Sequence, residues 1–208
     1  MDVSVYERNK EAADTENRYI LTCKNTDKIC IFTNKGQMHL LKVLDLPYGK
    51  FRDKGIPIDN LSNYNSSEEN FIYIINLGAI IHSRLLFGTK TAMLKMVDGS
   101  EFDVAKRTTA STKLNEDDEL LIVHAMTGEE TVVMQSEKEM FLRIEASTIP
   151  EKKKGAVGVR GMKLNAGDAL SNIYVLDGEN EQTVEVKGKE VVLNRLRVGN
   201  RDTKGTKR

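Results

Sequence analysis

Several residue types are scarce in this 208-residue chain, and each scarcity excludes a class of protein. Tryptophan is absent, and two cysteines are too few for a disulfide framework or a four-ligand zinc site. Lys plus Arg equals Asp plus Glu at 31 each, which excludes a wholly basic nucleic-acid-binding protein and an acidic tail protein. The longest apolar run, residues 71–81, is shorter than the roughly 18 residues that span a bilayer. No membrane partner is therefore expected.

The ends and the cysteines point to a cytoplasmic protein. The first residues show no charged-then-apolar leader, so we expect neither secretion nor membrane insertion. Cys23 and Cys30 flank the turn signal of residues 25–28, and a two-residue hairpin there would place the two thiols opposite each other. We expect reduced, half-buried thiols rather than a cross-strand disulfide.

The chain has little helical periodicity and many short β-rich runs. These runs are rich in branched and aromatic residues and are separated by Gly, Asn and Asp, which is typical of strands. The sequence therefore predicts an all-β protein with strands at 19–22, 29–33, 38–43, 71–76, 85–88, 92–97, 119–124, 131–135, 140–144, 172–176, 183–186 and 190–193.

The runs repeat with a period near 50 residues. The apolar–basic–apolar triplet 41–43 recurs at 94–96 and 142–144, and a second mark at 55–61 recurs at 108–114 and 158–164. A period of this length with about four strands per unit is typical of propeller blades, and the chain has room for about four. Residues 2–6 resemble residues 98–102, so we expect the chain to begin inside a repeat.

Charge follows the same period although it sums to zero. Residues 115–136 hold six acidic and no basic residues, a net −6, whereas residues 187–208 hold eight basic and two acidic residues, a net +6. In a ring of blades the same part of each repeat lies at the same radius, so the pattern indicates a basic rim suited to a polyanion. The other interpretation is that the charges only solvate loops.

The glycine-rich stretch 153–168, KKGAVGVRGMKLNAGD, resembles the outer element of a known domain family. That family comprises the C-terminal domains of bacterial type IIA topoisomerase A subunits, in DNA gyrase and topoisomerase IV. Further matches are FTNKG at 32–36, MHLLK at 38–42, DLP at 45–47 and RDKGIP at 52–57. The resemblance covers the chain from about residue 19 onward, so we expect residues 1–18 to be the end of a truncated blade or a linker. Residues 19–208 would form the domain.

The resemblance implies a β-pinwheel of about four four-stranded blades, with a strand exchanged between neighbours. It implies that the domain binds and bends double-stranded DNA on a basic outer rim and presents it to the breakage–reunion core. The residues that match the family's outer element are Lys50, Arg52, Lys54, Lys106, Arg107, Lys113, Lys152, Lys153, Lys154, Arg160, Lys163, Arg195, Arg197 and Arg201.

The parent enzyme implied by the resemblance is an ATP-dependent DNA topoisomerase, an isomerase that changes DNA topology in the cytoplasm at the bacterial nucleoid. Its partners would be the ATPase B subunit and the N-terminal breakage–reunion domain that precedes this one in the same polypeptide. ATP and Mg²⁺ would bind there, and we expect no cofactor and no catalytic site in this chain. Gyrase carries a Gln-Arg-Arg-Gly-Gly-Lys-Gly heptapeptide that has no match here, which favours a topoisomerase IV-like domain over gyrase.

Other features of the sequence do not indicate chemistry of their own. Arg18-Tyr19 matches the dipeptide of the family's nucleophile, but it starts a predicted strand, so we expect a packing role. The three histidines lack metal-ligand spacing, and the acid pairs 117–118 and 129–130 are expected in solvated turns. Glycines 155, 158 and 161 would let amides approach phosphates, although turns need glycine as well. The alternative function is a propeller-like scaffold that binds protein and ignores DNA.

Overall fold

Each repeat opens with a β-hairpin of constant geometry. The computed structural model describes all residues from 1 to 208, and its hairpins pair β1 (Lys28–Thr33) with β2 (Gln37–Lys42), β4 (Arg84–Thr89) with β5 (Met93–Asp98), and β8 (Thr131–Ser136) with β9 (Met140–Glu145). Each turn ends in a residue with left-handed backbone, namely Gly36, Ala92 and Glu139, at φ 69°, 63° and 64°. The shared turn fixes the register of the three hairpins relative to one another.

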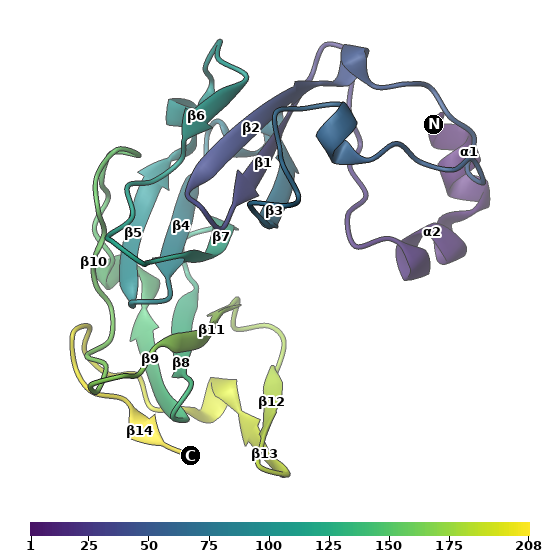
Figure 1. Cartoon of the computed structure of the whole chain (residues 1–208). Helices are drawn as coiled ribbons and strands as arrows, with labels where there is room; N and C mark the ends of the chain where they lie inside the picture. The colour runs from purple at the N-terminus through teal and green to yellow at the C-terminus, as the bar shows by residue number, and fades with distance from the viewer.

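Two further strands complete each hairpin to a four-stranded antiparallel blade. The inner strands are β3 (Phe71–Asn76), β7 (Leu120–Met126) and β11 (Leu170–Leu176), and β7 packs against both of the others. The outer strands are β6 (Thr108–Ala110), β10 (Val159–Arg160) and β14 (Thr206–Lys207). The resulting strand orders are β3-β1-β2-β6, β10-β5-β4-β7 and β11-β8-β9-β14, and the blades form an arc (Figure 1).

The outer strand of each blade comes from the next repeat along the chain. β6 follows the second hairpin in sequence but pairs with β2 of the first, and β10 follows the third hairpin but pairs with β5 of the second. The predicted pinwheel with strand exchange is therefore confirmed. The fourth repeat supplies β14 to the third blade, and its own hairpin, β12 (Thr183–Val186) with β13 (Lys189–Val192), remains a two-stranded sheet.

Helices are short and lie outside the blades or in their connections. α1 (Val3–Arg8) and α2 (Lys10–Glu16) stand apart from the arc at its N-terminal end, and α3 (Leu77–Ile80) follows β3 (Figure 1). Residues 1–18 thus contain two helices and no strand. None of the helices is long and apolar enough to cross a membrane. Single turns of 3-10 helix lie at Val43–Asp45, Ile58–Asn60, Gly99–Phe102, Ala146–Thr148 and Leu193–Arg195.

The core lies mainly between neighbouring blades. Phe32, Phe87 and Phe102 are buried together between the first two blades, with ring centroids 5.1 to 5.9 Å apart. Between the second and third blades, a methionine-rich cluster includes Met96 and Met134. A single blade has too little apolar surface on one face for independent stability, so the arc is stabilised by stacking of adjacent repeats.

Two sequence predictions about strands are wrong. Residues 19–22 form no strand, so Cys23 and Cys30 do not face each other across a hairpin, although both thiols are free. The triplets 41–43, 94–96 and 142–144 are also out of register. Pairing with the outer strands shows which residues of the hairpins are equivalent: Met38, Leu94 and Phe141 each lie opposite the corresponding residue of their outer strand. Connecting loops of different length shift the hairpins relative to a fixed period.

Two acidic residues expected in solvated turns are buried instead. Asp118 is 7% exposed and accepts a hydrogen bond of 3.0 Å from the backbone N–H of Thr91 in the neighbouring hairpin turn. Glu130 is 4% exposed and accepts three hydrogen bonds, from the backbone N–H and hydroxyl of Thr127 and from the N–H of Gly128. Carboxylates that accept several hydrogen bonds can organise a turn from a buried position, and tandem acids in a sequence do not reveal this.

The buried Glu130 predicts a measurable loss of stability in acid. Burial alone would raise the pKa of Glu130, but the hydrogen bonds from Thr127 and Gly128 outweigh it and lower the pKa to about 2. Because the folded-state pKa lies below the unfolded value, the stabilisation is complete above about pH 4.5 and is lost as the pH falls towards 2. Glu130→Gln should lower the free energy of unfolding on the order of 3 kcal/mol at pH 6, measured by urea denaturation.

The acid dependence is the diagnostic part of this prediction. The difference in unfolding free energy between Glu130→Gln and wild type should narrow as the pH falls from about 4.5 towards 2. Glu129→Gln is the matched control, since Glu129 is exposed and should have no effect. A difference that stays constant down to pH 2 would contradict a charge-dependent role for Glu130.

Candidate nucleic-acid interface

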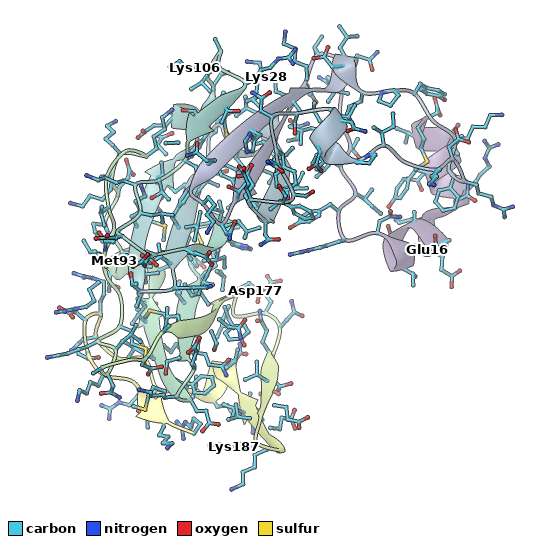
Figure 2. The ribbon with its side chains drawn as sticks, viewed as in Figure 1. Glu16, Lys28, Met93, Lys106, Asp177 and Lys187 are labelled. Carbon is cyan, nitrogen blue, oxygen red and sulfur yellow. The ribbon has the colours of Figure 1, made fainter.

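The basic segments of the sequence lie on the convex edge of the arc. The outer strands β6, β10 and β14 belong to the positively charged parts of the repeats, and the inner strands β7 and β11 belong to the negative parts. Figure 2 shows Lys106, which precedes β6, on the outer side, whereas Asp177, which follows β11, lies on the concave side. The net-positive segments therefore lie towards the convex edge and the net-negative segments towards the concave side, the arrangement that the charge count favours.

Some of the predicted rim cations are exposed and make no ion pair. They flank the outer strands, one before and one after β6 and β10 and one before β14, and the two that follow their strands are equivalent in register. These residues, which we call the free rim cations, are Lys106 and Lys113 beside β6, Lys152 and Lys163 beside β10, and Arg197 ahead of β14. Exposed, unpaired ammonium and guanidinium groups can contact phosphates without first breaking an internal interaction.

The remaining predicted cations of these three blades and of the fourth repeat are engaged within the chain. Ion pairs link Arg107 with Asp45, Lys153 with Glu101, Arg160 with Asp202 and Arg195 with Glu181. The Lys154 ammonium donates to the backbone carbonyl of Glu101 at 2.7 Å, and Arg201 donates to the carbonyl of Arg160 at 2.8 Å. These pairs are mostly exposed, so each stabilises the fold little and can be exchanged for a phosphate contact.

Lys50, Arg52 and Lys54 occupy a different setting. They lie in the segment that corresponds to the outer element of the first repeat, but residues 55–57 form no strand and pair with none of the three hairpins. In Figure 1 this segment extends away from the arc towards the N-terminal helices. All three side chains are exposed. The structure thus does not bring them together with the free rim cations of the three blades.

Sequence comparison of the repeats missed two rim lysines. Lys207 pairs in register with Met140, as Arg160 pairs with Met93, so Lys207 and Arg160 are equivalent residues of β14 and β10. Lys204 precedes β14 and is exposed. The spacing of glycine and cation could have revealed Lys207, because Gly205 stands two residues before it and Gly158 stands two residues before Arg160. The last repeat is too short for this spacing to be noticed in the sequence alone.

The glycine at 158 is required by strand exchange. A Cβ atom at Gly158 would lie 2.5 Å from the carbonyl oxygen of Leu94 on β5, and one at Gly205 would lie 2.6 Å from that of Phe141 on β9. The exchanged strand therefore approaches its acceptor hairpin too closely for any side chain at this position. Close backbone packing explains these glycines without a phosphate.

One cluster has the order of groups found in hydrolase triads. His39 Nδ1 lies 3.0 Å from the Thr108 hydroxyl, and His39 Nε2 lies 2.7 Å from a carboxylate oxygen of Glu69. His39 and Glu69 are buried, and the Thr108 hydroxyl also accepts a hydrogen bond from Asn63. Because Thr108 is on β6 and His39 on β2, the cluster fastens the exchanged strand to the first blade.

The Arg18-Tyr19 dipeptide also has structural contacts. The Tyr19 hydroxyl donates to the carbonyl of Ile72 on β3 at 3.1 Å, and the Arg18 guanidinium lies over the Tyr19 and Phe71 rings. These contacts attach the segment before β1 to the innermost strand of the first blade. They agree with a packing role for Tyr19.

Comparisons with known proteins agree on one family for this sequence and this fold. The DNA gyrase C-terminal domain, beta-propeller, family matches residues 83–125 and 130–177. The DNA gyrase A protein of Staphylococcus epidermidis is 31% identical over 196 residues, which are 90% of this chain and 22% of that protein. The chain thus spans about a fifth of the length of such relatives.

Solved structures agree on the fold. The C-terminal domain of DNA topoisomerase IV superposes with a TM-score of 0.82 at 21% identity, over 96% of this chain and 66% of that domain. The DNA gyrase A C-terminal domain superposes with a TM-score of 0.65, also at 21% identity, over 89% and 61%. The family match, the relatives covering 90% of this chain and the similarity of fold agree with one another. The chain belongs to the family of C-terminal β-pinwheel domains of type IIA topoisomerase A subunits, the family of DNA gyrase and topoisomerase IV.

Proposed function

We propose that this chain binds double-stranded DNA along its convex rim and bends it. The observation that carries the proposal is that exposed, unpaired cations flank the outer strand of each successive blade. A duplex can contact cations along the whole arc only if it curves with the arc. Bending a short site costs several kcal/mol, and many phosphate contacts along a rigid edge can offset that amount.

The proposal extends to the enzyme that would contain this domain. The domain would present DNA to the breakage–reunion domain of the same polypeptide, in an ATP-dependent type II topoisomerase that works with an ATPase B subunit in the bacterial cytoplasm. In this chain no three His, Cys, Asp or Glu side chains converge as a metal site. We propose that the Mg²⁺ and ATP of such an enzyme bind to its other domains, and that the contribution of this chain is to bind and orient DNA.

We favour a topoisomerase IV-like mode, in which DNA is bent with little chiral wrapping. The gyrase heptapeptide is absent, and the arc has only three complete blades along which a duplex can run. A gyrase-like mode is the second candidate, because the S. epidermidis relative at 31% identity is a gyrase protein.

Ligation of nicked circular DNA in the presence of increasing amounts of this chain tests both points. We expect binding that weakens steeply with salt, together with little change in the linking-number distribution of the ligated circles. A linking-number shift that grows with protein and disappears at high salt would establish chiral wrapping and favour the gyrase-like mode. Absence of binding even at low salt would contradict DNA binding and favour the protein-interaction scaffold.

A further inference from the structure

Lys95 is a lysine buried within the second blade. It lies in the middle of β5 and is only 1% exposed, which is rare for a lysine. Its ammonium group donates to three backbone carbonyls, those of Lys153 at 3.1 Å, Lys154 at 2.8 Å and Ala156 at 2.7 Å. It also lies 5.5 Å from the centre of the Phe87 ring on β4. All three N–H donors of the ammonium are thus used within the protein.

The three carbonyls belong to the segment that leads into the exchanged strand β10. This segment, residues 152–158, which we call the basic loop, carries three consecutive lysines. Glu101 holds it from the other side, since its carboxylate accepts a hydrogen bond of 3.0 Å from the backbone N–H of Lys154. Without an ammonium at their centre, three converging carbonyl oxygens would repel one another and have no donor.

The other blades fasten their outer segments with different side chains. His39 is the equivalent of Lys95 in the first hairpin and bonds to the Thr108 hydroxyl. In the third blade the equivalent residue is Leu142, and the next residue, Arg143, donates to the carbonyls of Asn194 and Leu196. A polar group from the hairpin therefore secures the incoming rim segment in all three blades, but only Lys95 gathers three carbonyls of one loop.

We propose that Lys95 is a positioning residue, which holds the basic loop in the conformation that presents Lys152 and Lys153 to a DNA phosphate backbone. This inference rests on the proposed DNA-binding function. It adds a buried residue that orders one part of the rim, the basic loop. Lys95 itself cannot contact DNA, because it is buried and its donors are occupied. Its charge acts through the loop.

The protonation of Lys95 should couple loop order to pH. Burial lowers the pKa of Lys95 to about 8, and the Glu101 carboxylate partly opposes this shift. The charged groups around the ammonium are Glu101 from the 3-10 turn and Lys153 and Lys154 from the loop, whereas Phe87 contributes no charge. Above pH 8 the neutral amine has one donor fewer, so one carbonyl loses its partner and the loop should loosen.

Lys95→Met tests the inference with hydrogen exchange and DNA binding. We expect amide exchange in residues 152–158 to accelerate at least about tenfold, and affinity for a DNA duplex at low salt to fall about tenfold. The slope of log affinity against log salt should fall by about one to two, because the loop contributes one or two phosphate contacts. Lys90→Met is the control, since Lys90 lies in the same blade and pairs with Glu119 outside the loop.

A chemical rescue separates positioning from a general loss of stability. In Lys95→Ala, ammonium chloride should slow exchange in the basic loop relative to sodium chloride of equal ionic strength, because the free ion can occupy the carbonyl cage. If either variant fails to fold, ¹⁵N NMR of wild-type lysine side chains applies instead. A Lys95 ammonium that exchanges slowly with water below pH 8 supports the inference, and one that exchanges as fast as exposed lysines overturns it.

The outcomes also distinguish this inference from the proposed function. If amide exchange in the basic loop is faster in Lys95→Met but the wild-type chain does not bind DNA, Lys95 holds the loop and the proposed DNA-binding function is contradicted. Unchanged loop exchange in a folded Lys95→Met protein would overturn the inference, whatever the affinity for DNA. Equal losses of affinity in Lys95→Met and Lys90→Met, with equal salt slopes, would also overturn it, because only net charge would then matter.

Discussion

Reversing the charge of three free rim cations, Lys106, Lys152 and Lys163, should weaken binding to a duplex of about 30 base pairs by about 100-fold or more at about 100 mM salt. Each lysine that neutralises a phosphate releases a condensed counterion, and that release supplies much of the affinity at low salt. A glutamate at the same place also repels the phosphates. Fluorescence anisotropy with a labelled duplex, repeated over a range of salt concentrations, measures the affinity and its salt slope together.

The control changes the same net charge away from the rim. Arg8, Lys10 and Arg18 are exposed and lie on or directly after the N-terminal helices, so reversing these three charges should alter affinity by less than about threefold through long-range effects. The salt slope should fall by about three in the rim variant and stay unchanged in the control. Equal losses in the two variants would contradict a localised rim and indicate that only total charge controls binding.

Phe102→Ala should lower the free energy of unfolding by about 3 to 5 kcal/mol, the usual range for deleting a buried phenylalanine. Phe102 is fully buried where it meets Phe32 of the first blade and Phe87 of the second. The cavity left by its ring would lie at the contact between blades, and the rigid surrounding strands limit how far it can collapse. Chemical denaturation of the purified chain, followed by circular dichroism, measures the change.

Tyr48→Ala is the matched control for Phe102→Ala. Tyr48 is 78% exposed, so its removal should change the unfolding free energy by no more than about 0.5 kcal/mol. Under conditions where Phe102→Ala remains folded, its affinity for DNA should stay near that of wild type, because Phe102 is buried, uncharged and unable to contact a phosphate. A loss of less than about 1 kcal/mol would show that the blades do not depend on this aromatic cluster for their stacking.

Most of the fold was predictable from the sequence because strand patterns are local. Eleven of the twelve predicted runs form strands, since branched residues between turn residues specify a hairpin with little outside help. The exception, residues 19–22, has the composition of a strand but finds no partner. The exchanged strands β6, β10 and β14 were missed as strands because each has only two or three residues, and its hydrogen-bonding partner lies in another repeat.

The site was less predictable than the fold. Charge counting found the basic rim, because every repeat contributes its charges at the same radius. It did not separate free cations from engaged ones, since the partner of Arg160 is 42 residues away and that of Lys153 is 52 residues away. The sequence also did not predict that Lys95, Asp118 and Glu130 are buried. The identity of a charged residue does not show whether its hydrogen bonds are made inside the protein or with water.

The exchange of outer strands has a consequence for how such arrays change length during evolution. Each hairpin accepts an outer strand from the repeat that follows it, and the pairing occurs at an equivalent step in each blade. Removing or duplicating the stretch between two equivalent residues, such as Leu94 and Phe141, leaves every internal hairpin next to a donor of the right register. Copy number can therefore vary through in-frame recombination that preserves the strand register of the remaining blades, and related arrays are expected to differ by whole repeats.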